Sequence, residues 1–101
     1  MNTLLTLLSL IFITPYQNSD YKIFVTNDKY QADLWVYRTD NKYQAKNVEQ
    51  IWFQTYDKYA SDFSARFVDS KYKADLIIYY TKTKNEAGWK KQHRLRGSLI
   101  K

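Results

Sequence analysis

The sequence predicts a strand-rich α+β domain made of five units of about 13 residues, each a short strand followed by an N-capped helical turn. Two observations predict this fold. A pentapeptide recurs along the chain, and a run rich in β-branched and aromatic residues precedes each copy. The copies are KYQAD at 29–33, KYQAK at 42–46, KYASD at 58–62, KYKAD at 71–75 and a degenerate KNEAG at 84–88, and they begin 13, 16, 13 and 13 residues apart.

Length and composition allow one domain and exclude several kinds of site. A chain of 101 residues with 18% aromatic residues is large enough for one packed core and too small for two. The chain has no Cys, which excludes disulfides, thiolate nucleophiles and the usual zinc sites. It also has only two Gly and one Pro, so its turns must depend on other chemistry.

The apolar run at 4–13, LLTLLSLIFI, is the first element of the chain. It is too short to cross a bilayer as a helix, which takes about 20 residues, but it suits the hydrophobic part of a secretory signal. No basic residue precedes it and no small-residue cleavage site follows it. The alternatives are an extra strand packed on the units or an unstructured end. We expect residues 1–20 to lie outside the repeat domain, with export or membrane tethering favoured over a cytoplasmic location.

The predicted strands are the runs at 22–26, 34–39, 51–56, 63–68 and 76–81. Runs of this length and composition are typical of strands. In the fourth run, Phe63, Ala65 and Phe67 alternate with polar residues, which indicates one wet face. The second and fifth runs, LWVY and LIIYY, are apolar on both sides and should be the most buried.

A preferred helix N-cap precedes every pentapeptide. The five caps are Asp28, Asn41, Asp57, Ser70 and Thr83. Their side-chain oxygens can accept a hydrogen bond from a free amide of the first turn. Three residues later come Gln31, Gln44 and Glu86 in three units, and Thr83 with Glu86 is the clearest capping box. These capped turns explain how the chain can change direction with so little Gly and Pro.

Small residues occupy the fourth position of every pentapeptide. They are Ala32, Ala45, Ser61, Ala74 and Ala87. We expect this position to face a neighbouring element where a larger side chain would not fit. The interval of 16 residues contains three additional residues within 46–50, which we interpret as a loop that interrupts the winding.

The connections between the predicted strands are short. One helical turn advances only about 5.4 Å, whereas a conventional parallel crossover needs roughly 10 to 12 residues. Consecutive strands must therefore run antiparallel, or the chain must wind so that strands pair with non-consecutive units. A β-solenoid is also conceivable, although the Gly-rich corners common in such folds are missing.

The units resemble a small family of bacterial proteins with tandem YKSQAD-type repeats and no assigned activity. The resemblance rests on [DN]-K-Y-Q-A-[DK] in the first two copies, on strands of the LWVY type and on the closing Glu86-Ala87-Gly88-Trp89, and it covers about residues 21–93. It implies a compact chain wound into a deep torus knot of seven crossings, and it implies no biochemical activity. The sequence departs from the family at Tyr43 and Tyr72, where a Ser is usual, and in its degenerate fifth copy.

No catalytic set, cofactor motif or metal site is visible in the sequence. His93 is the only histidine, so we expect it to be solvated or to pack locally on Trp89. Asp33, Asp62 and Asp75 are separated by whole units and lack a Gly-containing calcium loop. We expect them to be solvated residues at the junction of turn and strand.

The tyrosines of the pentapeptides, Tyr30, Tyr43, Tyr59 and Tyr72, form the most conspicuous constellation. They are either a ladder of stacking platforms for single-stranded nucleic acid or carbohydrate, or one packing position used four times. We favour packing, because residues 1–89 hold 11 basic and 10 acidic side chains and so lack the surplus positive charge that phosphate binding needs.

Residues 90–101 form a basic tail with five basic side chains and no acidic one. Its candidate partner-binding residues are Lys90, Lys91, His93, Arg94 and Arg96. They could contact nucleic acid or an anionic surface. We expect a monomeric, non-enzymatic repeat scaffold or interaction module over residues 21–89 that resists unfolding and needs no cofactor. The alternatives are weak nucleic-acid or anionic-surface binding through the tail, and an exported or membrane-tethered surface protein.

Overall fold

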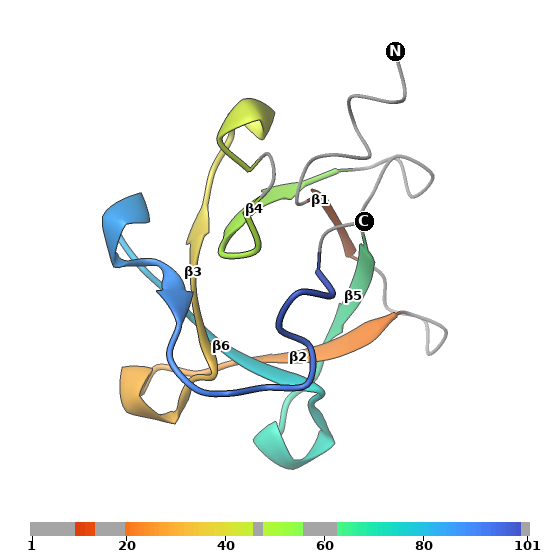
Figure 1. Ribbon diagram of the computed structural model, residues 1–101. Coiled ribbons are helices and arrows are strands. Elements are labelled where there is room, and N and C mark those ends of the chain that lie inside the picture. Colours follow the sequence, from red (N-terminus) through yellow and green to blue (C-terminus); the bar gives the residue numbers. More distant parts are fainter. Residues whose placement is uncertain (1–9, 14–19, 46–47, 56–62, 100–101) are drawn as a thin grey trace.

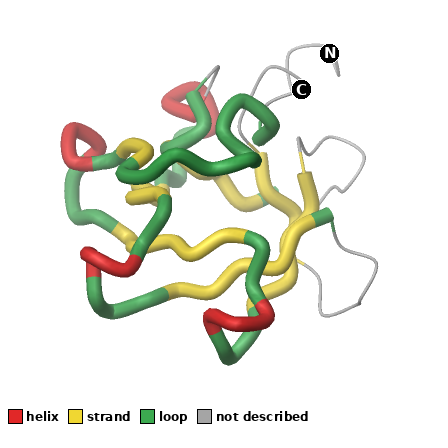
Figure 2. The backbone as a smooth tube through the Cα atoms, turned by 60° about the horizontal axis from the view of Figure 1, so that its bottom comes forward, coloured by secondary structure: helices red, strands yellow, loops and turns green. Residues whose placement is uncertain are grey.

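The structure, a computed structural model, describes residues 10–13, 20–45, 48–55 and 63–99. Within these residues it contains seven strands and four short 3-10 turns (Figure 2). The strands are β1 (Leu10–Ile13), β2 (Tyr21–Val25), β3 (Leu34–Arg38), β4 (Ile51–Gln54), β5 (Phe63–Phe67), β6 (Leu76–Tyr80) and β7 (Gly88–Trp89), and the turns are η1 (Lys29–Gln31), η2 (Lys42–Ala45), η3 (Lys71–Lys73) and η4 (Lys84–Glu86). The five strands expected from the sequence are present within two residues of their predicted ends.

The strands curl into one sheet that closes into a ring (Figure 1). Their order is β4-β1-β5-β2-β6-β3-β7, and the carboxyl half of β3 also pairs with β4. Among the described strands every pairing is parallel except that of β7 with β3. The antiparallel alternative is therefore wrong. Closure leaves few unpaired edge groups on β1 to β6.

Strands from the two halves of the chain alternate around this ring. β5 lies between β1 and β2, and β6 lies between β2 and β3. The chain thus passes around the ring once through β1 to β4 and again through β5 to β7. The steps from β1 to β2, from β2 to β3, from β5 to β6 and from β6 to β7 each pass over one strand of the other pass, whereas β3 and β4 pair directly. β2 consequently pairs only with strands from the second pass.

The register explains why eight residues suffice between two parallel strands such as β2 and β3. Val25, the last residue of β2, and Leu34, the first of β3, both pair with Ile78 of β6. The end of β5 and the start of β6, Phe67 and Leu76, likewise share Ile23. β3 and β6 therefore start at the level where β2 and β5 end. The connection only has to step sideways over one strand, about 10 Å for two strand spacings, and does not return along the sheet.

The core fills the inside of the ring. Alternate residues of the strands are buried, among them Ile23, Leu34, Val36, Leu76 and Ile78 at 0% exposure. This alternation follows from the period of two along each strand. No helix among the described residues is long and apolar enough to span a membrane.

Both predicted domain ends differ from the structure. The boundary at residue 21 excluded β1, yet β1 pairs with β4 and β5 inside the sheet. The expected tail also belongs to the domain, because Leu95 and Leu99 are buried in the same core. The backbone of β1 found partners in two neighbouring strands, and the apolar Leu95 and Leu99 were available for burial.

The aspartates that end the pentapeptides are not solvated residues as predicted. The backbone N–H of Asp33 donates to the carbonyl of Ile77 at 2.8 Å, and its Oδ2 accepts from the N–H of Ile77 at 3.0 Å. Asp75 makes the same pair of bonds with Lys22. The carboxylate thus takes the place of a backbone carbonyl at the start of a strand. Asp62 lies outside the described residues.

Three of the predicted caps are confirmed. Side-chain oxygens of Asp28, Asn41 and Ser70 accept from the backbone N–H two residues later at 3.0 to 3.2 Å. Thr83 makes no such bond. Its hydroxyl donates instead to Glu86 Oε1 at 3.1 Å, so the capping box predicted there is wrong.

Other predicted features of the turns have mixed outcomes. Asp57 and Ser61 lie outside the described residues. Ala32 and Ala45 are buried as expected, whereas Ala74 and Ala87 are half-buried. Sequence reasoning missed a threonine two residues before the cap. In the first two turns its hydroxyl accepts a hydrogen bond from the backbone N–H of the cap residue. The third and fifth units also have a threonine two residues before the cap.

Replacing Asp33 with Ala should lower the free energy of unfolding by about 1–3 kcal/mol, because the N–H of Ile77 loses its acceptor at a site where the carboxylate is 17% exposed. Urea denaturation with an unchanged m-value measures the loss. Asp69→Ala is the matched control, since that side chain is 87% exposed and, among the described residues, pairs only with Lys73. Equal stability of the two variants would contradict the strand-anchoring role.

Candidate functional site

Residues 90–99 fold back over the domain and do not form a free basic tail. The N–H of Lys90 donates to the carbonyl of Asp33 at 2.9 Å. Leu95 and Leu99 are 5% and 0% exposed. In Figure 1 this segment, in dark blue, runs across the ring of strands. Its hydrogen bonds to the rest of the domain are with Asp33, Gln31, Glu49 and Asp75, which precede strands, so the segment covers the amino ends of the barrel.

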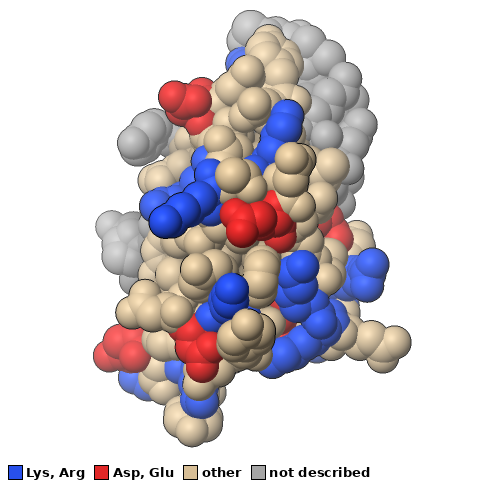
Figure 3. All heavy atoms as spheres, turned by 90° about the vertical axis from the view of Figure 1, so that its left-hand side faces the viewer, with Lys and Arg blue, Asp and Glu red and all other residues tan. Residues whose placement is uncertain are grey.

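Three of the cations that suggested a partner-binding surface contact the domain itself, and Arg96 is exposed. Lys90 Nζ lies 4.4 Å from the ring centroid of Trp35. Lys91 Nζ donates to a backbone carbonyl of η1 at 3.3 Å, and Arg94 Nη2 lies 3.3 Å from Asp75 Oδ1. These three side chains are still exposed to solvent. On the face in Figure 3 basic and acidic side chains are interspersed, so no single-sign patch covers that face.

His93 packs against Trp89, as one of the two alternatives predicted. The two rings are stacked with centroids 5.9 Å apart. Nδ1 accepts from the N–H of Leu95 at 3.1 Å, and Nε2 lies 3.6 Å from Asp33 Oδ2. The side chain is only 15% exposed, so these contacts give His93 a structural role in holding the C-terminal segment on the domain. Among the described residues no three His, Cys, Asp or Glu side chains gather as metal ligands would.

Glu49 anchors the C-terminal segment, and sequence reasoning missed it. Its Oε1 accepts from Trp89 Nε1 at 3.0 Å and from the N–H of Gly97 at 2.8 Å, and its Oε2 accepts from the N–H of Leu99 at 2.8 Å. Gly97 has φ of +89°, a backbone conformation that other residues rarely adopt, at the bend that brings the last two donors together. Glu49 lies in the range 46–50, which contains the three additional residues of the longer interval. That irregular spacing was the only sign in the sequence that this range has a special role.

The described tyrosines of the pentapeptides are exposed, so the predicted packing position is wrong for them. Tyr30, Tyr43 and Tyr72 are 78%, 66% and 88% exposed, and Tyr59 lies outside the described residues. The Lys before each exposed ring places its Nζ 5.4 to 5.6 Å from the ring centroid. Each of these corners is held by its cap and by the Ala or Asp that follows, and the tyrosine ring points outward.

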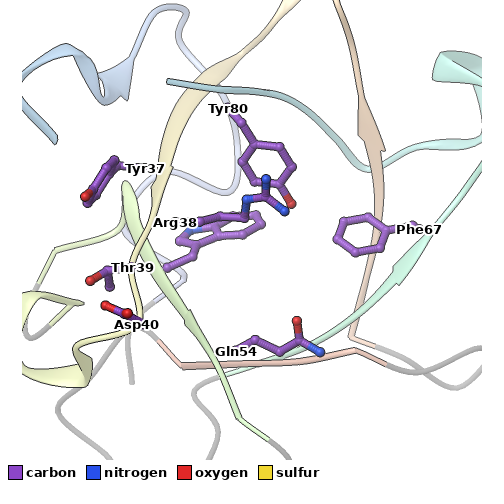
Figure 4. A pocket seen from close by; sticks show the side chains of 8 residues that line it. Tyr37, Arg38, Thr39, Asp40, Gln54, Phe67 and Tyr80 are labelled. Carbon is purple, nitrogen blue, oxygen red and sulfur yellow. The ribbon is translucent and has the colours of Figure 1, made fainter. Parts of the chain in front are cut away.

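A cavity of about 600 Å³ opens at the carboxyl ends of the strands. It is lined by Tyr37, Arg38, Thr39, Asp40, Trp52, Gln54, Phe67 and Tyr80. Figure 4 shows Arg38, Gln54, Phe67 and Tyr80 around the opening, with Tyr37, Thr39 and Asp40 on the far side of β3 from Phe67. Sequence reasoning did not single out this group, because its members belong to four separate segments.

Arg38 and Tyr80 form one side of this cavity. The guanidinium carbon of Arg38 lies 4.0 Å from the ring centroid of Tyr80, which is the geometry of a cation–π contact. Burial raises the pKa of the Tyr80 hydroxyl above its ordinary value, although the positive charge of Arg38 acts in the opposite direction. The hydroxyl is therefore protonated and can donate a hydrogen bond at neutral pH.

Glu49→Ala should lower the free energy of unfolding by roughly 2–4 kcal/mol, because three donors lose one charged acceptor at once. Chemical denaturation measures the loss, and hydrogen exchange should show faster exchange of the Gly97 and Leu99 amides. Glu86→Ala is the control, since its side chain is exposed and its change should stay within about 0.5 kcal/mol. Unchanged protection of both amides in Glu49→Ala would refute the anchor.

Comparison with known proteins places the chain in a family. Neither the search of curated proteins nor that of solved structures found a match. The family model described as the 7(1) septoil knot domain matches residues 10–90. This span begins at β1 and ends just after β7, so it contains every described strand. The chain therefore belongs to the septoil knot domain family.

Proposed function

We propose that this protein is a non-enzymatic interaction domain whose knotted chain resists unfolding. One observation carries the proposal: the two passes of the chain alternate around the ring of strands. All steps along the chain except that from β3 to β4 pass over one strand, so the chain needs two circuits of the ring, as the winding of a torus knot does. The description of the family agrees with this winding. Knots of any kind are rare in proteins.

Interleaving makes local opening difficult. The N–H of Ile77 bonds to Asp33 across 44 residues, and that of Lys22 bonds to Asp75 across 53 residues. β2 pairs only with β5 and β6, so it loses both neighbours if the second pass leaves. Regions that open separately need a set of contacts of their own, and here β2, β5 and β6 pair with no strand of their own pass. Threading adds a kinetic barrier, so resistance should appear as slow unfolding.

A cut between the two passes tests the role of the winding. A protease site inserted within residues 56–62 lets one sample be compared before and after cleavage, with the described strands unchanged. Cleavage should raise the unfolding rate constant at least roughly 100-fold, because the passes can then separate without unthreading. Stopped-flow or manual-mixing unfolding in denaturant measures the rate.

The matched control carries the same site within residues 14–19, where cleavage frees β1 alone and leaves β2 to β7 continuous. Its effect should be at least about tenfold smaller. Equal acceleration by the two cuts would show that chain breakage alone, and not separation of the passes, determines the rate.

The exposed corners supply a surface suited to partners. Tyr30, Tyr43 and Tyr72 place large amphipathic rings in solvent at three separate turns of the domain. Tyrosine is enriched at protein interfaces because it buries a large area at a small cost in side-chain entropy. Each ring also has a lysine beside it. Such repeated corners support a multivalent contact rather than catalysis.

Changing Tyr30, Tyr43 and Tyr72 together to Ser should abolish partner retention in a pull-down, while the free energy of unfolding changes by less than about 1 kcal/mol because the rings are exposed. The control is a triple variant at other exposed positions, Lys82→Ser, Asn85→Ser and Gln92→Ser. Retention of the same proteins by both triple variants would exclude the corners as the contact surface.

A further inference from the structure

The two ends of the barrel differ. The C-terminal segment covers the amino ends of the strands through the buried Leu95 and Leu99. Within the described residues no comparable segment covers the carboxyl ends, where the cavity of about 600 Å³ opens. Small-molecule sites typically occupy about 300 to 1,000 Å³, and in parallel α/β sheets and barrels they lie at the carboxyl ends of the strands.

The lining continues the inward-facing rows of the core. On β3 the row runs Leu34, Val36, Arg38, and the first two are fully buried. On β5 the row runs from the buried Phe63 and Ala65 to Phe67, which is 41% exposed. Side chains two apart share one face of a strand. The mouth is therefore formed by the last inward-facing residues, and one of them is a cation.

Among the described residues that line this cavity, Arg38 is the only basic one. It has no ion pair with any carboxylate of the described residues. Its guanidinium is held on the ring of Tyr80, 4.0 Å from the centroid. A guanidinium that stacks through its face keeps its edge N–H groups available, and this fork matches a carboxylate in two parallel hydrogen bonds.

The other walls determine what accompanies the carboxylate. Phe67 and Trp52 contribute aromatic surface, and the Gln54 amide adds one neutral polar group. Figure 4 shows the Phe67 ring facing Arg38 and Tyr80 across the opening. A phosphate would prefer more than one cation, and Asp40 at the rim adds an acid. The lining therefore fits a single planar anion with an apolar ring.

We propose that the open mouth of the barrel binds a small aromatic carboxylate. Arg38 receives the carboxylate, Phe67 and Trp52 contact the ring, and Tyr80 positions Arg38 by stacking on it. The site is separate from the tyrosine corners and from the C-terminal segment, because its residues come from the carboxyl ends of β3 to β6 and the residues that follow β3.

Binding of 3-phenylpropionate, measured by Trp fluorescence and by NMR shifts of the Arg38 and Phe67 amides, tests this site. The full chain should bind it with a Kd of roughly 1 mM or tighter, as a ligand of this size allows. The uncharged 3-phenylpropionamide should bind at least about tenfold more weakly, because it lacks the charge that Arg38 recognises.

Arg38→Met should reduce the affinity for the acid to that for the amide. Arg66→Met is the matched control, because Arg66 is next to Phe67 in β5 but faces the other side of the sheet, and it should leave binding unchanged. Phe67→Ala should weaken acid and amide alike and gives a second measure if Arg38→Met does not fold. The absence of binding at about 10 mM, equal affinity for acid and amide, or unchanged acid binding by Arg38→Met would each overturn the proposal.

Discussion

The fold depends on one geometric constraint: β2, β3 and β6 each start level with the end of the preceding strand and are separated from it by one strand of the other pass. Val25 and Leu34 share Ile78 as a partner, and Phe67 and Leu76 share Ile23. Because backbone groups inside a sheet must find hydrogen-bond partners, the intermediate strand has to be present. It comes from a segment more than 40 residues away along the chain. The two passes therefore form one sheet or none.

The corners make this register possible. A connection of eight residues can step over one strand only if it does not spend length on a return path. The capped 3-10 turn shortens the path, and the following aspartate bonds at once to the strand that was passed over, as Asp33 does to Ile77. Cap and aspartate thus fix both ends of the step. This is why two Gly and one Pro are enough for the whole chain.

Sequence reasoning found what local chemistry determines. The strand runs and the caps at Asp28, Asn41 and Ser70 were predictable, because composition and capping act over a few residues. The exposure of Tyr30, Tyr43 and Tyr72 was not, because an aromatic residue in a repeat suggests packing unless the turn is known to point it outward. The anchor at Glu49 needs donors from positions 89, 97 and 99, and no local pattern reports a contact of that range.

The same limit applies to the barrel mouth, and it shows how this fold separates stability from binding. Arg38 follows Leu34 and Val36 on the inward face of β3, and both of these residues are completely buried. From the sequence alone, a charged residue at this position suggests only that the strand ends there and leaves the core. Only closure of the ring places Arg38 opposite Phe67 and Gln54. The amino ends hold the buried leucines and the Glu49 anchor, while the carboxyl ends hold an exposed cation without an acidic partner among the described residues. Because the interleaved strands and the covered end can supply stability, the residues at the open end are free to be selected for a ligand.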